Sequence, residues 1–427
     1  MNRKNLLWKK QSLIVVTLLA GLAGSAFAGS KYQVIHRFQQ TGILGTTPID
    51  LISDGAGNLY GTTDSGGEYG YGTVFELSPP GSGGDFWTKT LLYSFRTGAG
   101  VYHTAAGGSL VLDQSGNVYG VSTYGGHGCS MFGCGYVFKL TAPTGAESGW
   151  TESTLYTFSG WDGFQPGGLA LDPAGNVYGV TSYGGHGCMA TGCGTVFELT
   201  PSSDGKTWTR TVLYSFKGVP GDQGSGDGAD PIGVTFSEAG NLYGATVGGG
   251  NCQVSTCHGT AFELRPPTKK GGSWIESVLY RFPIGSDQPY SGVVLGKSGA
   301  LYGSTVYSVY QLVLLHGAWT ENVLTTGGYI YGGVILDEAG NLYGTALFTS
   351  QYTNGIVYKL TPPAMGHSTW TQTVIHAFAS GNDGQAPDSG LTFGLNGMLY
   401  GTTLRGGNDQ CQVDGGAGCG IVFTIAP

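Results

Sequence analysis

A histidine and two cysteines lie close together in a glycine-rich stretch of the sequence. The three could bind a metal ion together, or the two cysteines could form a disulfide. The three residues are His186, Cys188 and Cys193, within "GNVYGVTSYGGHGCMATGCGTVFELT" (175–200). Thiolates and imidazoles are zinc ligands, but a zinc site would need reduced thiols and a fourth ligand. The CxxC spacing of thiol redox enzymes is missing. We therefore expect a disulfide between Cys188 and Cys193, with a zinc site as the alternative.

The other cysteines repeat this arrangement. All 8 cysteines of the chain fall into four local pairs: Cys129/Cys134, Cys188/Cys193, Cys252/Cys257 and Cys411/Cys419. Pairing within each group is the simplest connectivity, and closing a loop of this length stabilises the fold by about 2 kcal/mol in the chain-entropy model. Tyr124 and Tyr183 hold matched positions ahead of two of the pairs and are candidate ligand-binding residues.

Four aspartates recur in a second pattern, each shortly before a proline. They are Asp162 in "DGFQP", Asp227 in "DGADP", Asp287 in "DQP" and Asp383 in "DGQAP". The simpler interpretation is turn formation, in which Asp accepts nearby backbone N–H groups and Pro directs the next strand. The alternative is a partial ring of carboxylates that holds Ca²⁺. We predict no other cofactor.

Aromatic residues are abundant in the same segments. Trp161 and Phe164 are the preferred ligand contacts because they flank Asp162, and Tyr290 is a further candidate beside Tyr124 and Tyr183. Flat rings near carboxylates suit sugar faces and peptide segments, while ordinary packing between loops is the competing explanation. Other aromatic residues of these loops are Tyr69, Tyr71, Tyr102, Phe132, Tyr329 and Tyr331.

Signatures of common enzymes are missing from the sequence. It contains no GxSxG elbow, no HExxH pair and no phosphate-binding P-loop. Carboxylates for glycoside chemistry could still be spread over distant repeats, where sequence order would not reveal them. Catalysis is therefore uncertain, a binding role is favoured, and no catalytic residue is assigned.

The N-terminus has the pattern of a secretory signal peptide. Arg3, Lys4, Lys9 and Lys10 precede a short apolar run, and "SAFA" ends at Ala28 with small residues at the cleavage positions. We predict a signal peptide over residues 1–28 and export to the periplasm, the cell surface or the medium. A retained N-terminal anchor is the alternative.

The charge of the mature chain narrows the partners. Four of the 19 Lys and Arg residues leave with the signal peptide, so 15 remain against 27 acidic residues, a net charge of −12. Such a chain is not expected to bind nucleic acid or anionic membranes. No second apolar run has membrane length. We expect a monomer without a membrane span, whose partner is an extracellular glycan or protein.

One short motif shows how these residues are positioned. The string "GN[LV]YG", or a close variant, occurs seven times, with its tyrosine at Tyr60, Tyr119, Tyr178, Tyr243, Tyr302, Tyr343 and Tyr400. A high glycine content (80 residues), little charge and short apolar runs at this period predict an all-β propeller with one blade per repeat.

Each repeat reads as four strands. In the third repeat they are expected at 166–172, 176–182, 195–200 and 208–216, where apolar, β-branched and aromatic residues are concentrated. The cysteine pairs then fall in loops between second and third strands. A tryptophan opens the fourth strand six times, at Trp87, Trp150, Trp208, Trp274, Trp319 and Trp370.

The seventh repeat lacks its own fourth strand. It ends at "GIVFTIAP", while "VIHRF" (34–38) near the N-terminus closely matches "VIHAF" (374–378) in a fourth strand. We predict a seven-bladed propeller of four-stranded blades, with the last blade closed by the N-terminal strand and a single domain over 29–427. Closure removes exposed sheet edges. A linear array with a capping strand is the alternative.

The repeat also resembles a known family. "GNLYGTTDSGGEYGYGTVFEL" (57–77) and "WTKTLLYSF" (87–95) are similar to the GloVer repeat of exported bacterial proteins, named for Gloeobacter and Verrucomicrobia. The resemblance covers nearly the whole mature chain, although "ALYGSTVYSVYQLVLL" in the fifth repeat departs from it. It implies a propeller and carries no activity or catalytic residues.

Three functions therefore remain open. We favour an exported propeller that binds a glycan or protein on its loop-rich face. The alternatives are a propeller hydrolase or lyase that acts on polysaccharide, and a structural surface protein.

Overall fold

The computed structural model describes residues 32–427 except 40–44, 82–83, 85, 97–109, 127–128, 130–132, 144–148, 189–190, 220–222, 254–255, 270, 285, 366–367, 396, 409–410 and 414–415. The chain divides into two compact units, Met1–Lys31 and Tyr32–Pro427, of which the second holds every described residue. The predicted signal peptide, residues 1–28, lies outside the described residues, as do Tyr102 and Phe132. The signal peptide stays a prediction.

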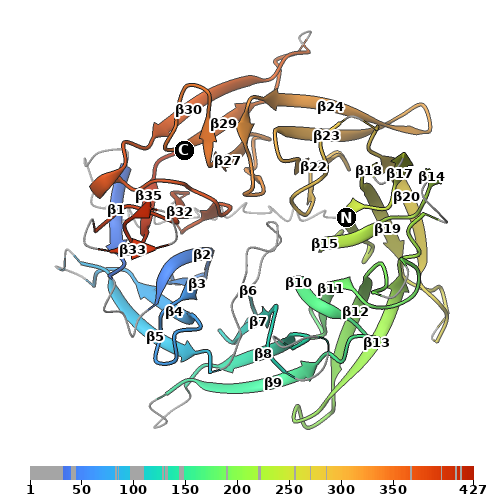
Figure 1. The fold of residues 1–427 in the computed structure, drawn as a ribbon, viewed down its shortest axis with the longest axis horizontal. Coiled ribbons are helices and arrows are strands. Elements are labelled where there is room, and N and C mark those ends of the chain that lie inside the picture. Colours follow the sequence, from blue (N-terminus) through green and yellow to red (C-terminus); the bar gives the residue numbers. More distant parts are fainter. Residues whose placement is uncertain are drawn as a thin grey trace, which may run out of the picture. The chain divides into compact units, whose positions relative to one another are not determined.

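Seven four-stranded antiparallel sheets are formed by the described residues of the second unit, and they surround a common centre (Figure 1). The predicted seven-bladed propeller is therefore confirmed. The first four blades are blade 1, β2 (Thr46–Ser53), β3 (Leu59–Ser65), β4 (Thr73–Ser78) and β5 (Thr88–Ser94); blade 2, β6 (Leu110–Leu112), β7 (Val118–Ser122), β8 (Tyr136–Thr141) and β9 (Thr151–Thr157); blade 3, β10 (Phe164–Leu171), β11 (Val177–Tyr183), β12 (Thr195–Pro201) and β13 (Trp208–Ser215); and blade 4, β15 (Ala229–Phe236), β16 (Leu242–Gly248), β19 (Thr260–Arg265) and β20 (Ile275–Arg281).

The remaining blades follow the same order. They are blade 5, β21 (Val294–Leu295), β22 (Leu301–Ser304), β23 (Ser308–Leu315) and β24 (Ala318–Thr326); blade 6, β26 (Ile335–Leu336), β27 (Leu342–Ala346), β29 (Ile356–Thr361) and β30 (Thr371–Ala377); and blade 7, β31 (Thr392–Phe393), β32 (Leu399–Thr403), β35 (Ile421–Ile425) and β1 (Tyr32–Arg37). In blade 7 the N-terminal strand pairs with the C-terminal one, Val34 opposite Phe423, as predicted.

The repeated motif forms the tight turn between the first two strands of a blade. In blade 3, Asp172 Oδ1 accepts hydrogen bonds from the backbone N–H groups of Ala174 and Asn176, both at 2.9 Å. Its Oδ2 accepts from the Asn176 side chain at 2.8 Å and from the Tyr178 hydroxyl at 3.3 Å. The Asn and Tyr of "GNVYG" therefore both donate hydrogen bonds to the Asp172 carboxylate. Asp54, Asp113 and Asp337 do the same in blades 1, 2 and 6.

The glycine that ends the motif makes room for the core. Gly179 in β11 lies opposite Phe197 in β12, whose ring is fully buried. A Cβ on Gly179 would lie 2.6 Å from Phe197 Cζ, closer than any ordinary contact. The ring thus occupies the space that a side chain would fill. The equivalent third-strand rings are Phe75, Phe138, Phe262, Tyr310, Tyr358 and Phe423.

Neighbouring blades are joined along their outer strands. Arg210 in β13 donates to the Tyr156 hydroxyl of blade 2 at 3.1 Å, and Tyr280 of blade 4 donates to Glu321 of blade 5 at 3.1 Å. At the seam that closes the ring, Tyr32 of β1 stacks on His376 of blade 6, with ring centroids 3.8 Å apart. The N-terminal strand therefore supplies a blade-to-blade contact as well as backbone hydrogen bonds.

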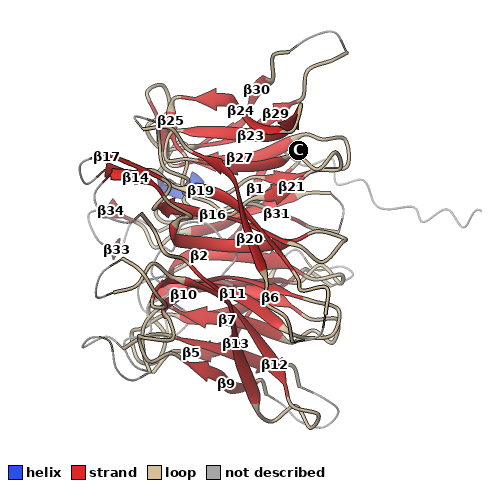
Figure 2. Ribbon diagram, turned by 90° about the vertical axis from the view of Figure 1, so that its right-hand side faces the viewer, coloured by secondary structure: helices blue, strands red, loops and turns tan. Residues whose placement is uncertain are grey.

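The loops separate onto two faces. The first strand of a blade begins, and its second strand ends, on what we call the loop-rich face; the tight turns lie on the opposite face. Extra ribbons lie on the loop-rich face, toward the left of Figure 2. They are β14 (Gln223–Ser225) with β17 (Asn251–Gln253) and β18 (Thr256–Cys257), β25 (Gly328–Tyr329) with β28 (Phe348–Thr349), and β33 (Gln412–Val413) with β34 (Gly416–Ala417).

Helix is nearly absent from the described residues. They contain one 3-10 turn, Gly381–Asp383. Among them, no helix has the length and apolar character needed to cross a membrane.

Candidate functional site

The cysteines form disulfides in the loops where pairing was predicted. The four bonds are Cys129–Cys134, Cys188–Cys193, Cys252–Cys257 and Cys411–Cys419. With Cys188 and Cys193 bonded to each other, neither sulfur is a thiolate ligand, and the zinc alternative for His186 loses its donors. The His186 backbone N–H instead donates to Ser215 Oγ at 2.7 Å, which ties the loop to the end of β13.

The aspartates proposed as calcium ligands each accept a hydrogen bond from another residue of the propeller. Asp162 accepts from the Ser159 N–H at 2.8 Å and from the Tyr156 hydroxyl. Burial alone would raise the pKa of Asp162, but these hydrogen bonds and the nearby Arg210 guanidinium outweigh it and lower the pKa. The carboxylate therefore connects the Ser159 backbone to the Tyr156 side chain of the fourth strand, β9.

The other three aspartates behave similarly. Asp227 accepts from the Tyr214 hydroxyl at 2.6 Å and from the Gly218 N–H at 2.9 Å. Asp383 accepts from the Ala379 N–H at 2.7 Å and lies 3.2 Å from His376 Nε2, while Asp287 accepts from the Thr305 hydroxyl at 3.5 Å. Within the described ranges, no three His, Cys, Asp or Glu side chains are grouped so that they could hold a metal ion. The structure does not bring the four carboxylates together.

The aromatic residues preferred from the sequence separate in the structure. Trp161 is 84% exposed in a turn, whereas Phe164 is half-buried in β10 and pairs with Tyr183 of β11, with ring centroids 5.6 Å apart. The Gln165 side-chain amide donates to the Tyr124 hydroxyl at 3.1 Å. Phe164, Tyr183 and Tyr124 thus belong to packing between blades 2 and 3, and Phe164 does not share an exposed turn with Trp161.

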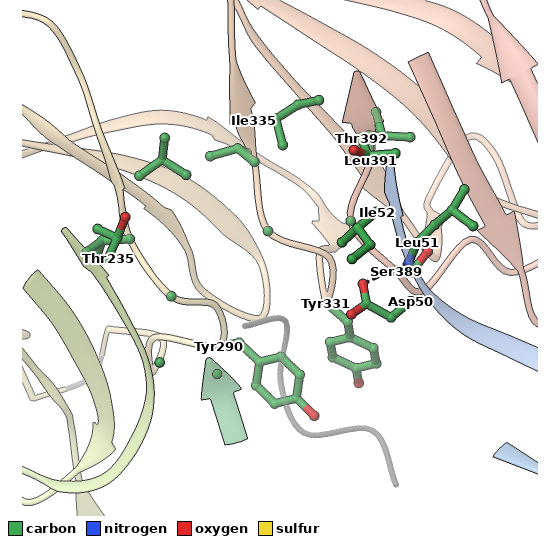
Figure 3. A pocket seen from close by; sticks show the side chains of 18 of the residues that line it. Asp50, Leu51, Ile52, Thr235, Tyr290, Tyr331, Ile335, Ser389, Leu391 and Thr392 are labelled. Carbon is green, nitrogen blue, oxygen red and sulfur yellow. Dashed lines mark hydrogen bonds between the residues drawn. The ribbon is translucent and has the colours of Figure 1, made fainter. Parts of the chain in front are cut away.

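A cavity of about 510 Å³ lies at the centre of the ring (Figure 3). Its walls come from the first-strand segments of six blades, at residues 49–52, 168–169, 233–235, 290, 292–294, 331, 333–335 and 388–392. Most of the lining side chains are apolar or carry hydroxyl groups. The aromatic and charged lining residues are Tyr290, Tyr331, Asp50 and Asp388.

The two tyrosines form an adjacent pair at the mouth of the cavity on the loop-rich face. Their ring centroids are 4.7 Å apart and their planes are inclined at 34°. Both hydroxyl groups project in the same direction (Figure 3). Burial, the neighbouring phenol of Tyr331 and the Asp388 carboxylate raise the pKa of Tyr290. Burial and Asp388 likewise raise the pKa of Tyr331. Both phenols therefore stay neutral and can donate as well as accept hydrogen bonds.

Carboxylates from blades 1 and 7 line the same cavity. Asp50 Oδ1 accepts from the Leu51 N–H at 2.9 Å, and Oδ2 accepts from the Leu110 N–H at 3.3 Å, which orients the group. Asp388 lies close enough to Tyr290 and Tyr331 to affect both phenols. Two neutral phenols and two hydrogen-bond acceptors therefore face one concave space.

Sequence comparison places the chain in a family. It matches the Gloeobacter/Verrucomicrobia repeat over residues 23–189 and 133–311. The chain belongs to the Gloeobacter/Verrucomicrobia repeat family. No curated protein shows significant sequence similarity to this chain.

Solved structures show that this repeat-family chain shares its fold with proteins of different activities. A polysaccharide lyase of family PL25, an ulvan lyase bound to -[GlcA(1-4)Rha3S]-, has a TM-score of 0.50 at 11% identity, over 86% of this chain and 90% of the lyase. A putative 6-phosphogluconolactonase from Bacteroides uniformis has a TM-score of 0.50 at 15% identity, over 81% of this chain and 88% of that one. At these identities the likeness shows the fold alone.

Only some of the cavity residues were predicted from the sequence. Tyr290 was a candidate from the sequence and Tyr331 was noted among the loop aromatics, but Asp50 and Asp388 were not singled out. Tyr290, Tyr331 and Asp388 precede the buried Val293, Val334 and Leu391 by three residues each, and so occupy one repeat position in three consecutive blades. An alignment of the repeats on these buried residues would have placed Tyr290, Tyr331 and Asp388 at one equivalent position.

Proposed function

We propose that this repeat-family propeller is a carbohydrate-binding protein that holds uncharged sugar residues in its central cavity. The observation that carries the proposal is the tilted Tyr290–Tyr331 pair beside two carboxylates in one cavity of about 510 Å³. Aromatic rings offer flat apolar faces for the C–H side of a sugar. Carboxylate oxygens accept hydrogen bonds from sugar hydroxyls, and the volume is in the range of small-ligand sites.

The charge of the site supports a neutral ligand over an anionic one. Asp50 and Asp388 both line the cavity. At an effective dielectric constant near 20, a ligand carboxylate or sulfate about 5 Å from either would be repelled by roughly 3 kcal/mol. Uronates and sulfated sugars are therefore disfavoured as ligands, and unmodified hexoses, pentoses or N-acetylated sugars are favoured.

The orientation of Asp50 favours binding over hydrolysis. Both of its oxygens accept backbone N–H groups, which fixes the carboxylate as an acceptor. A ligand hydroxyl can add to this shell as a further donor, whereas proton donation to a glycosidic oxygen would require the acid form. Release of sugar products would distinguish the hydrolase or lyase alternative from binding.

An exported location is part of the proposal. The four disulfides support it because such bonds form and persist in oxidising compartments. A cavity open on the loop-rich face could then meet extracellular glycans.

A glycan array followed by calorimetry tests the proposal. The wild-type protein should retain neutral glycans, and the double variant Tyr290→Ala/Tyr331→Ala should bind the same glycans at least tenfold more weakly. Trp161→Ala is the control, because that ring is 84% exposed and does not line the cavity. Thermal unfolding of each variant would show that the propeller stays folded.

Three outcomes would contradict the proposal. The first is wild-type protein that retains no neutral glycan. The second is loss of binding in Trp161→Ala but not in the double variant, which would move the site to the turn predicted from the sequence. The third is release of sugar products during incubation, which would support the enzyme alternative.

A further inference from the structure

The aromatic surface does not end at the cavity. Tyr331 is followed by Tyr329, with ring centroids 6.1 Å apart, and Tyr329 contacts both Phe348 at 4.2 Å and Tyr307 at 4.7 Å. Together with Tyr290 these rings form a continuous series, which we call the aromatic ladder. It begins at the cavity mouth and crosses blades 5 and 6 on the loop-rich face.

The ladder is held on a rigid backbone. Tyr329 in β25 is paired with Phe348 in β28, a two-stranded ribbon in which the Leu347 N–H donates to the Tyr329 carbonyl at 2.8 Å. The Ile330 N–H donates to the Val306 carbonyl at 2.8 Å, which ties the segment to blade 5. The rings are therefore placed by hydrogen-bonded backbone from two blades.

The outer end of the ladder is open to solvent. Tyr307 is 40% exposed and Phe348 is 39% exposed. The hydroxyls of Tyr307 and Tyr329 are hydrogen-bonded to each other at 3.1 Å, which fixes the two rings relative to each other. A contiguous group of exposed, fixed rings is typical of a binding surface, whereas single exposed apolar residues are ordinary.

The loops that carry the ladder lack the disulfides found in the loops of blades 2, 3, 4 and 7. No cysteine occurs between Cys257 and Cys411, so blades 5 and 6 have no disulfide in their second-to-third loops. In blade 6 the β25–β28 ribbon connects that loop to the preceding one. On the loop-rich face of these two blades, ring contacts and the β25–β28 ribbon connect the loops.

We infer that the ladder binds a carbohydrate chain of several units, which runs from the central cavity to the rim between blades 5 and 6. This inference rests on the proposed function and extends the same site. The centroid distances from Tyr290 through Tyr331 and Tyr329 to Phe348 are 4.7, 6.1 and 4.2 Å, a path longer than one sugar ring. A chain of several sugars would therefore contact more than one of these rings.

The surroundings of the ladder match an uncharged chain. Asp287 lies near Tyr307 at the outer end, and Asp388 lies near Tyr331 at the inner end. Acceptors at both ends suit a polyhydroxylated ligand. Sugar hydroxyls can donate to the Asp287 and Asp388 carboxylates while the rings contact the apolar sugar faces, so we commit to carbohydrate.

Chain-length dependence tests the inference. Calorimetry would compare the disaccharide and the hexasaccharide of the cello-, xylo-, manno- and N-acetylchito-series. Wild-type protein should bind the hexasaccharide of its preferred series at least tenfold more tightly than the disaccharide. The variant Tyr307→Ala/Phe348→Ala should lose that gain and keep the disaccharide affinity. Tyr69→Ala is the matched control, because Tyr69 is equally exposed, at 40%, on blade 1.

The failures of the two proposals are distinguishable. Equal affinity for both chain lengths, or equal weakening of both by Tyr307→Ala/Phe348→Ala, would overturn the ladder inference and leave the cavity site standing. Loss of the hexasaccharide gain in Tyr69→Ala would also overturn it. Wild-type protein that binds no member of any series, but binds an extended peptide at the ladder, would overturn both proposals.

Discussion

Replacing Gly179 by alanine should destabilise the propeller through a single steric contact. The new Cβ would lie 2.6 Å from Phe197 Cζ and 2.8 Å from Leu169 Cδ2. The backbone of Gly179 is in a region that alanine adopts freely, so strain in φ plays no part. The ring of Phe197 is fully buried.

The magnitude follows from two opposing effects. An added methyl group in a well-packed core costs about 1–3 kcal/mol. Alanine also restricts the unfolded chain, which returns about 0.4–1 kcal/mol. The free energy of unfolding should therefore fall by about 1–2 kcal/mol.

Equilibrium unfolding in urea measures this loss. Gly55→Ala is the control, because a Cβ there would meet nothing within 4 Å and its backbone is also not left-handed. That variant should match or slightly exceed the stability of the wild type. In the Phe197→Leu background, Gly179→Ala should cost about 1 kcal/mol less, since the opposing ring is gone. An unchanged cost in that background, or wild-type stability of Gly179→Ala itself, would refute the steric argument.

Three further predictions concern Glu276 of β20, the disulfide-bonded loops and the tight turns. The pKa of Glu276 is raised to about 7, first by burial and then by the nearby Asp227 carboxylate, so stability should fall as pH rises from about 4.5 to 7. Allowing for solvent screening, Glu276→Gln should be about 1 kcal/mol more stable than wild type at pH 8 and no more stable at pH 4; a pH-independent difference would rule this out. Replacing Cys188 and Cys193 by serine should lower the free energy of unfolding by about 2 kcal/mol. Thiol titration of the denatured, unreduced protein should find no free thiol, and finding eight would be incompatible with the loops described. Asp172→Ala removes the acceptor of four hydrogen bonds and should cost about 1–3 kcal/mol in urea unfolding; no loss would mean that the turn forms without its carboxylate.

Strand positions were predictable because their signals are local. The second strand of blade 3 was expected at 176–182 and is β11, Val177–Tyr183, and the third was expected at 195–200 and is β12, Thr195–Pro201. Turn formation needs only the Asp, Asn and Tyr of one motif, and these residues lie within seven positions of one another. Ring closure was predictable for a related reason, since the N-terminal strand carries the sequence pattern of a fourth strand.

The contacts between repeats were not predictable in the same way. Arg210 meets Tyr156 across 54 positions, and Tyr32 meets His376 across 344 positions of the chain. The sequence showed recurring aspartates but not their partners. Asp162 and Asp383 could have converged on a metal ion or accepted a hydrogen bond from a Tyr or His of a fourth strand. The choice depends on side-chain directions, which the repeat period does not specify.

By itself, the sequence determined the number of blades, the order of strands, the closure of the ring and the pairing of the cysteines. All of these depend on residues that are near neighbours in the chain or on copies of one repeated pattern. Only the tertiary structure decided where a ligand could bind. Asp50, Tyr290, Tyr331 and Asp388 come from four blades, and they line one cavity because the ring places the first strand of each blade around a single axis.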